Sequence, residues 1–188
     1  MNEISQKIYT RFGDRGQTKL LSGETVEKDD LRVNTYGALD ELQSHLGMAR
    51  SLIREEHVRS ILLAIQKDLF VAGAELASTP ERIYKRKKRI TTKDVKKIED
   101  WIDQAVERYG MPSGFVVPGD SLDSAALHLA RSVCRRVERL IVRLNRIDGT
   151  YKVVIVYLNR LSDLLFVLAW SLAVMAAIEQ VFNELKVL

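Results

Sequence analysis

The chain has 188 residues, enough to bury a hydrophobic core without disulfides or structural metals. Its composition, 46% hydrophobic and 29% charged, excludes a disordered tail and is that of an ordinary globular protein. The formal net charge of +4 fits an anionic small ligand as well as a nucleic acid and does not decide between them.

Residues 1 to about 29 show no helical period and are punctuated by Gly13, Gly16 and Gly23. Glycines let backbone N–H groups turn inward, so this segment can form an anion cradle with nearby cations, namely Arg11, Arg15, Lys19 and Lys28. It is not a Walker A loop, because Gly13 and Gly16 enclose only two residues. A flexible tail with turn residues is the alternative interpretation.

Apolar residues then recur at helical spacing five times. The predicted helices span about 30–54, 58–78, 91–110, 122–146 and 152 to the C-terminus. Thr91 and Asp94 have the spacing of a capping box, and Gly110 is a natural helix stop. No strand is evident. We therefore predict an all-α fold, a five-helix up-and-down bundle with an N-terminal Gly-rich loop, as one domain over 1–188 (loop 1–29, bundle 30–188).

The predicted helix 122–146 carries polar residues on a face opposite its core stripe. The core stripe is Leu122, Ala126, Leu129, Val133, Val137, Leu140 and Leu144. The polar stripe is Ser124, His128, Arg131, Arg135 and Glu138, and nearby apolar residues indicate that it too is covered. Covered arginines are costly unless they are paired or bind a ligand. A functional site and a structural ion-pair network both remain open; the other arginines, from Arg136 to Arg146, resemble a solvated face.

Two further helices carry unusual faces. On the last helix, Asn159, Asp163, Phe166 and Trp170 share a face away from the core stripe. On the first, small residues at 37, 44, 47 and 51 surround Asp40, the one charge of that stripe. Small side chains allow the close approach of a neighbouring helix or subunit.

Several other chemistries are not indicated. The three histidines form neither an H-E-x-x-H nor a Glu-x-x-His pair, which argues against zinc and di-iron sites. The lone Cys134 excludes an internal disulfide, favours a reducing, cytoplasmic compartment and is expected to be a small buried hydrophobe. The "YKRKKR" run is expected to be a solvated loop, because no helix-turn-helix or aromatic-interleaved basic patch accompanies it. The uncharged run 164–178 is short for a membrane span and predicts a core helix.

Three segments together resemble the ATP:cob(I)alamin adenosyltransferases of the propanediol-utilisation type. They are "KIYTRFGDRGQTKLLSGETVEKDDLRVNTYGALDEL", "FVVPGDSLDSAALHLARSVCRRVERLIVRL" and "YLNRLSDLLFVLA", which occur in the family's order and cover essentially the whole chain. The resemblance implies transfer of the 5′-deoxyadenosyl group of ATP to cob(I)alamin, giving adenosylcobalamin and triphosphate. It also implies a homotrimer of five-helix bundles with ATP between neighbouring subunits.

The resemblance assigns roles to residues by matching motif positions. The front loop is implied to fold over ATP, and the implied nucleotide-binding residues are Thr10, Arg11, Phe12, Gly13, Asp14, Gly16, Thr18, Lys19, Lys28, Arg135, Arg136, Val137, Glu138, Arg139 and Asn159. Glu138 is also the expected Mg²⁺ ligand. Arg135 is expected to stabilise the leaving triphosphate, and Asp40 to pair with Arg131 across a subunit interface. Phe115 matches the aromatic residue beneath the corrin ring, where it favours reduction of cob(II)alamin to cob(I)alamin.

Two departures from the family pattern stand out. Asp120 replaces the second glycine of a Pro-Gly-Gly sequence, where it could cap the following helix or change the loop below the corrin. Trp170 stands where the family has an arginine. The remaining alternative function is an ATP-binding corrinoid sensor or carrier without turnover. A reductase is an expected partner; nucleic acid and membrane are not.

Overall fold

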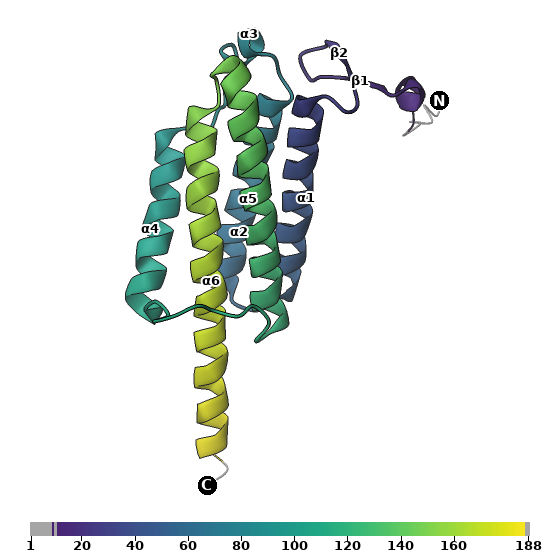
Figure 1. Cartoon of the computed structure of the whole chain (residues 1–188). Helices are drawn as coiled ribbons and strands as arrows, with labels where there is room; N and C mark the ends of the chain where they lie inside the picture. Colours follow the sequence, from purple (N-terminus) through teal and green to yellow (C-terminus); the bar gives the residue numbers. More distant parts are fainter. Residues whose placement is uncertain (1–8, 10, 187–188) are drawn as a thin grey trace, which may run out of the picture.

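The structure, a computed structural model, describes residue 9 and residues 11–186. Five long helices form its body: α1 (Leu31–Leu52), α2 (Glu56–Leu76), α4 (Thr92–Tyr109), α5 (Leu122–Asp148) and α6 (Lys152–Leu185). They run alternately down and up (Figure 1). The predicted all-α bundle is confirmed, and each predicted helix boundary up to residue 152 lies within about two residues of the observed one. A single-turn helix not predicted from the sequence, α3 (Pro80–Ile83), follows α2.

Helix α5 is the central element because it packs against both α1 and α6. Its buried face is therefore turned toward the groove between those helices, and it includes Leu127, Ala130 and Ile141. The predicted core stripe of this helix was wrong at two positions. Leu122 is 78% exposed and Leu129 is 45% exposed. A helix covered on two sides buries a wider face than a single apolar stripe indicates.

The N-terminal segment contains a small hairpin, so the expectation of no strand was wrong. A 3₁₀ turn, η1 (Phe12–Arg15), leads into β1 (Gln17–Lys19), which pairs antiparallel with β2 (Thr25–Glu27). The hairpin's turn is tied to the end of α2: Leu20 is buried, and the Leu21 amide donates to the Ala77 carbonyl at 2.8 Å. Its other end, with η1, stands clear of the bundle (Figure 1).

Arg32 joins several elements at the upper end of the bundle. Its Nη1 donates to the carbonyl oxygens of Leu76 and Ser78 and to the hydroxyl of Tyr151. Its Nη2 forms an ion pair with Asp148 at 2.9 Å. The side chain thus links the start of α1 to the end of α2 and to the α5–α6 connection.

Helix ends follow local side-chain chemistry. The Asp94 carboxylate accepts the backbone N–H of Thr91 at 2.8 Å, and Gly110 ends α4 with φ of +67°; both features are as predicted. The N-cap of α5 is Ser121, whose hydroxyl accepts the Ser124 amide at 3.3 Å. Asp120 is exposed and does not cap this helix, because Ser121 already occupies the capping position.

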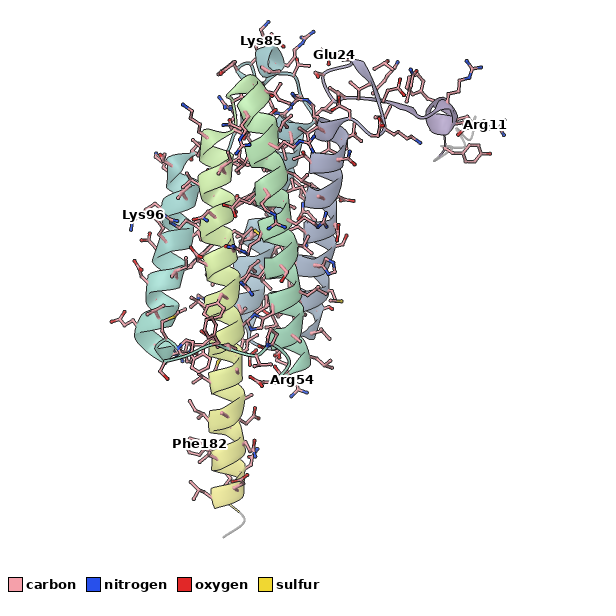
Figure 2. The ribbon with its side chains drawn as sticks, viewed as in Figure 1. Arg11, Glu24, Arg54, Lys85, Lys96 and Phe182 are labelled. Carbon is pink, nitrogen blue, oxygen red and sulfur yellow. The ribbon has the colours of Figure 1, made fainter. Side chains whose placement is uncertain are left out.

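Helix α6 extends well past the bundle. Core residues of α6 end at Leu172, and beyond it Ile178, Val181, Phe182 and Leu185 are exposed. Figure 2 shows Phe182 on this projecting part. By length and composition alone α6 could cross a membrane, but core helices of soluble proteins meet the same criteria, and half of its most apolar window is buried within the bundle.

Candidate functional site

A polar pocket of about 420 Å³ lies between α5 and α6. It is lined by Arg135, Glu138, Arg139, Val142, Arg143, Arg146 and Asn159. Asn159 Nδ2 donates to Glu138 Oε1 at 3.2 Å, and Arg160 Nη1 donates to Asn159 Oδ1 at 2.7 Å. These hydrogen bonds orient the amide and the carboxylate. The pocket therefore offers four arginines, one carboxylate and one amide, a donor set suited to a phosphorylated ligand.

A second pocket of about 330 Å³ lies farther down the same two helices and reaches the loop after α4. Arg131, Arg135, Asp163 and Phe166 line it, together with apolar residues that include Met111. Arg135 lines both pockets and is the one residue that they share. A group shared by two pockets can contact two ligands at once.

The surroundings of Arg131 leave hydrogen-bonding capacity unused. Its guanidinium lies 5.8 Å from the ring centre of Phe166, and His128 meets the same ring edge-on at 5.9 Å. Among the described residues, Arg131 Nε, His128 Nδ1 and Trp170 Nε1 are buried atoms without a hydrogen-bond partner. Burial, and then the charge of Arg131, lower the pKa of His128, whereas Asp120 raises it. Buried polar groups without partners are rare, which marks this region for a further contact.

The alternative interpretation of the polar stripe on α5, a structural ion-pair network, is not observed within one chain. Over the described ranges, no ion pair joins Arg131 or Arg135 to a carboxylate. Arg136 does form an ion pair, with Glu41 of α1, and Val137 is fully buried in the core. Neither of these two predicted nucleotide contacts lines the polar pocket.

The N-terminal segment brings several predicted nucleotide contacts together. A Cβ at Gly13 would lie 2.8 Å from Lys28 Nζ, so this lysine lies against the loop backbone and a larger residue would displace its flexible end. The Lys28 amide donates to the Gly16 carbonyl at 2.7 Å, and Lys19 Nζ lies 5.0 Å from the ring centre of Phe12. Three other predicted contacts lie on the same segment: Arg11 precedes η1, Asp14 is within η1, and Thr18 is in β1. Thr10 lies outside the described residues.

Three predicted groups remain apart in a single chain. The η1 end of the N-terminal segment stands off the bundle rather than over the α5–α6 pocket (Figure 2, Arg11). Asp40 is exposed on α1 and does not pair with Arg131. Phe115 is fully exposed on the loop between α4 and α5. These residues all lie on free surface where a second molecule can reach them.

Sequence reasoning missed part of the polar pocket. Arg143 and Arg146 resembled a solvated face, but they line the pocket with Arg139. Their spacing of four and seven residues from Arg139 places them on one helix face, and this signal was available in the sequence. Arg160, which positions Asn159 and pairs with Glu99 at 3.1 Å, had no comparable signal.

The site's metal-binding and nucleophilic capacity is limited. Among the described residues, no group of three or more His, Cys, Asp or Glu side chains could hold a metal by itself. Glu138 is the one carboxylate lining the polar pocket. Cys134 is fully buried, its Sγ donates to the Leu158 carbonyl at 3.3 Å, and burial raises the pKa of the thiol. It is therefore a structural residue and not a nucleophile.

Comparisons with known proteins agree with the fold and with the resemblance. The cobalamin adenosyltransferase family model matches residues 8–172. A corrinoid adenosyltransferase of Citrobacter freundii is 44% identical over 163 residues, which cover 87% of this chain and 93% of that protein. One from Bacillus subtilis is 39% identical, with 87% and 84% covered.

A solved structure gives the same picture. It is a phenylalanine-to-alanine variant of a PduO-type ATP:corrinoid adenosyltransferase from Lactobacillus reuteri, in complex with cobalamin and ATP. It superposes with a TM-score of 0.81 at 36% identity and covers 89% of this chain and 93% of that one. On the match over most of its length, this chain belongs to the cobalamin adenosyltransferase family.

Proposed function

We propose that this protein transfers the 5′-deoxyadenosyl group of ATP to cob(I)alamin, releasing triphosphate. The observation that carries the proposal is the α5–α6 pocket, where Arg135, Glu138, Arg139 and Asn159 converge on one cavity. Each of these residues matches a nucleotide position of the family by sequence, and the geometry supports that assignment. A variant of the related enzyme of known structure was solved in complex with cobalamin and ATP.

The proposed chemistry needs little covalent help from the protein. The cobalt(I) electron pair attacks C5′ of ATP, a Co–C bond forms, and the C5′–O bond breaks with its electrons leaving on triphosphate. Negative charge therefore increases on the leaving group, and pre-positioned cations stabilise it. Arg135 is best placed for this role because it lines both the polar pocket and its neighbour. Asn159, held by Arg160, orients the nucleotide.

The residues present fit a Mg²⁺ ion that travels with the nucleotide. Mg²⁺ in nucleotide sites is held by one or two carboxylates together with phosphate oxygens, and Glu138 supplies the one carboxylate of the pocket. The ion would neutralise charge on the phosphates. The orientation of Glu138 by Asn159 prepares the carboxylate for this contact.

We propose that the site is completed by a neighbouring copy in a homotrimer. The η1 end of the N-terminal segment stands clear of the bundle (Figure 1) and carries Arg11 with it (Figure 2), which supports a contact with the pocket of another subunit. Asp40 is an exposed carboxylate and Arg131 has an unpartnered Nε, so a pairing between subunits would satisfy both. Alanine at Asp40 should then weaken the trimer, which sedimentation velocity measures.

Phe115 is proposed to cover the lower face of the corrin. Its complete exposure on the α4–α5 loop leaves the ring free to contact a ligand. Removal of the lower axial ligand makes cob(II)alamin easier to reduce, and a reductase would supply the electron. A cytoplasmic location remains a prediction.

The first test is an anaerobic assay with purified protein, Mg²⁺-ATP and chemically reduced cobalamin. The adenosylcobalamin spectrum and stoichiometric triphosphate are the expected products. ATP binding without either product would instead favour the sensor or carrier alternative. The controls are one reaction without enzyme and one without ATP.

A further inference from the structure

The positive charge of this protein is concentrated in one short segment. Residues 79–90 contain six Lys and Arg residues and one Glu, a net charge of +5. Because the whole chain carries +4, the other 176 residues carry −1. The net positive charge of the chain therefore comes from the α3 region, because the charges of the other residues nearly cancel.

This segment forms one wall of a pocket of about 650 Å³, here called the α3 basic pocket. The opposite wall is the turn of the N-terminal hairpin, with Leu21 and Ser22, and the floor includes Ser78 at the end of α2. The basic side chains of the lining are Arg82, Lys85, Arg86, Lys87 and Lys88. The α3 basic pocket and the polar α5–α6 pocket have no lining residue in common.

The cations of the α3 basic pocket lack partners within the chain. Arg89, at the end of the run, is neutralised by the buried Glu75 at 3.3 Å. Over the described part of the chain, none of the five lining cations forms an ion pair, and Arg86 Nε is a buried atom without a hydrogen-bond partner. Glu81 lies within the same segment, and Glu24 lies on the hairpin turn; a hydrogen bond from Ser22 and, more weakly, Arg82 lower the pKa of Glu24. Figure 2 shows Glu24 and Lys85 at this end of the molecule.

From this arrangement we propose that the α3 basic pocket binds a chain of phosphates, separately from the candidate active site. Five cations that form no ion pair among the described residues line one pocket and create a positive potential there. Leu21 is the one apolar side chain in the lining, and no aromatic ring lines the pocket, so its cations favour phosphates over a base. The phosphate chain, and not the nucleoside, is the recognised group. Its source is either free triphosphate or a free nucleotide.

Occupancy of this pocket would act on the hairpin that carries the predicted nucleotide contacts. The hairpin turn is fixed to α2 by the Leu21–Ala77 hydrogen bond and by Thr79 N–H donating to Ser22 Oγ at 3.2 Å. An anion held between Ser22 and the lysines would strengthen the same attachment. Amide hydrogen exchange at Leu21 and Thr79 should therefore slow when the pocket is filled.

The test is calorimetric titration of the full-length protein with sodium tripolyphosphate at fixed ionic strength. The variant Lys85→Ala/Lys87→Ala/Lys88→Ala should bind about tenfold or more weakly at one class of site, because three charge contacts are lost. The matched control is Lys93→Ala/Lys96→Ala/Lys97→Ala, which removes three exposed lysines of α4 and the same net charge; Lys96 is labelled in Figure 2. The control should bind within about twofold of wild type.

Additional titrations separate the outcomes. Arg135→Ala should still bind tripolyphosphate at the α3 basic pocket. Loss of all tripolyphosphate binding in Arg135→Ala would overturn the proposal, whether or not transferase activity survives. Equal weakening in the two lysine variants would also overturn it, because the effect would then be general charge. ATP that binds this site more tightly than tripolyphosphate would overturn recognition of the phosphate chain alone, and equal binding would support it. A single-stranded oligonucleotide that outcompetes both would make the surface a nucleic-acid site and end the small-anion proposal.

Discussion

Two arginine-centred regions, one at the end of the bundle and one along its side, show opposite uses of the same side chain. Arg32 is about nine-tenths buried, and its guanidinium bonds to two carbonyls, a hydroxyl and a carboxylate. Arg135 is exposed beside three other arginines and has no ion-pair partner among the described residues. Both lie on helices of one bundle, so the difference comes from what surrounds them.

In this molecule, an arginine with partners inside the chain stabilises the fold, and an arginine without them in a pocket is available to bind a ligand. Buried charge is tolerated at Arg32 because every nearby acceptor is used. The four arginines of the polar pocket repel one another, and binding of an anion would relieve this repulsion. Substitutions in the two regions should therefore separate stability from activity.

The largest effect on stability is expected at Arg32. Arg32→Ala removes the ion pair of Asp148 and the side-chain donor to two carbonyls, and should lower the free energy of unfolding by about 3 kcal/mol. Urea denaturation followed by circular dichroism measures this. Arg59→Ala, which removes an exposed pair with Glu56, is the control and should change it by less than about 1 kcal/mol. Equal losses in the two variants would break the comparison.

The largest effect on activity is expected at Arg135. Arg135→Ala should lower adenosyl transfer by about 100-fold to 1000-fold through loss of charge stabilisation on triphosphate. Its urea midpoint should stay within the error of wild type, because the side chain is exposed. A variant that is inactive only because it unfolds would remove Arg135 from the catalytic assignment.

A narrower effect is expected at Phe115. Phe115→Ala should leave ATP affinity within about twofold of wild type, because the residue lies outside the polar pocket. Turnover that starts from cob(II)alamin should fall by about tenfold or more, while turnover from chemically reduced cob(I)alamin should fall much less. Unchanged turnover in both assays would withdraw the proposed role.

The smallest effect concerns pH. Burial and Arg131 lower the pKa of His128, so below about pH 6.5 the unfolded chain binds a proton that the folded chain does not. Stability should therefore decline as the pH falls from 7 to 5, by at most about 1.4 kcal/mol per pH unit from this group. His128→Gln should flatten that decline. An identical pH profile in the variant would show that other groups dominate.

The sequence predicted the helices well because each buries a regular apolar stripe, and local caps such as Thr91 with Asp94 mark their ends. It failed where elements are too short to show a period. The two strands have three residues each and α3 has four, so each spans little more than one repeat and shows no recognisable period. Leu122 and Leu129 were misassigned because packing on two sides of α5 decides which face is buried.

The polar pocket could be predicted only in halves. The stripes on α5 and α6 were each visible, but Glu138 and Asn159 are 21 residues apart and meet only when the helices pack. Arg143 and Arg146 were assigned to solvent because an arginine-rich face usually is solvated. The resemblance, and not periodicity, connected the N-terminal loop to this pocket, and their meeting stays a prediction because it needs a second subunit.

The burial of Cys134 has a practical consequence. The only thiol of the protein adjoins Arg135 in sequence, yet it points into the core with its proton directed at the Leu158 carbonyl. A reagent that alkylates thiols can therefore reach it only when the bundle opens. The labelling rate of this one atom reports the opening of the α5–α6 contact, without any engineered probe and in the same solution in which turnover is measured.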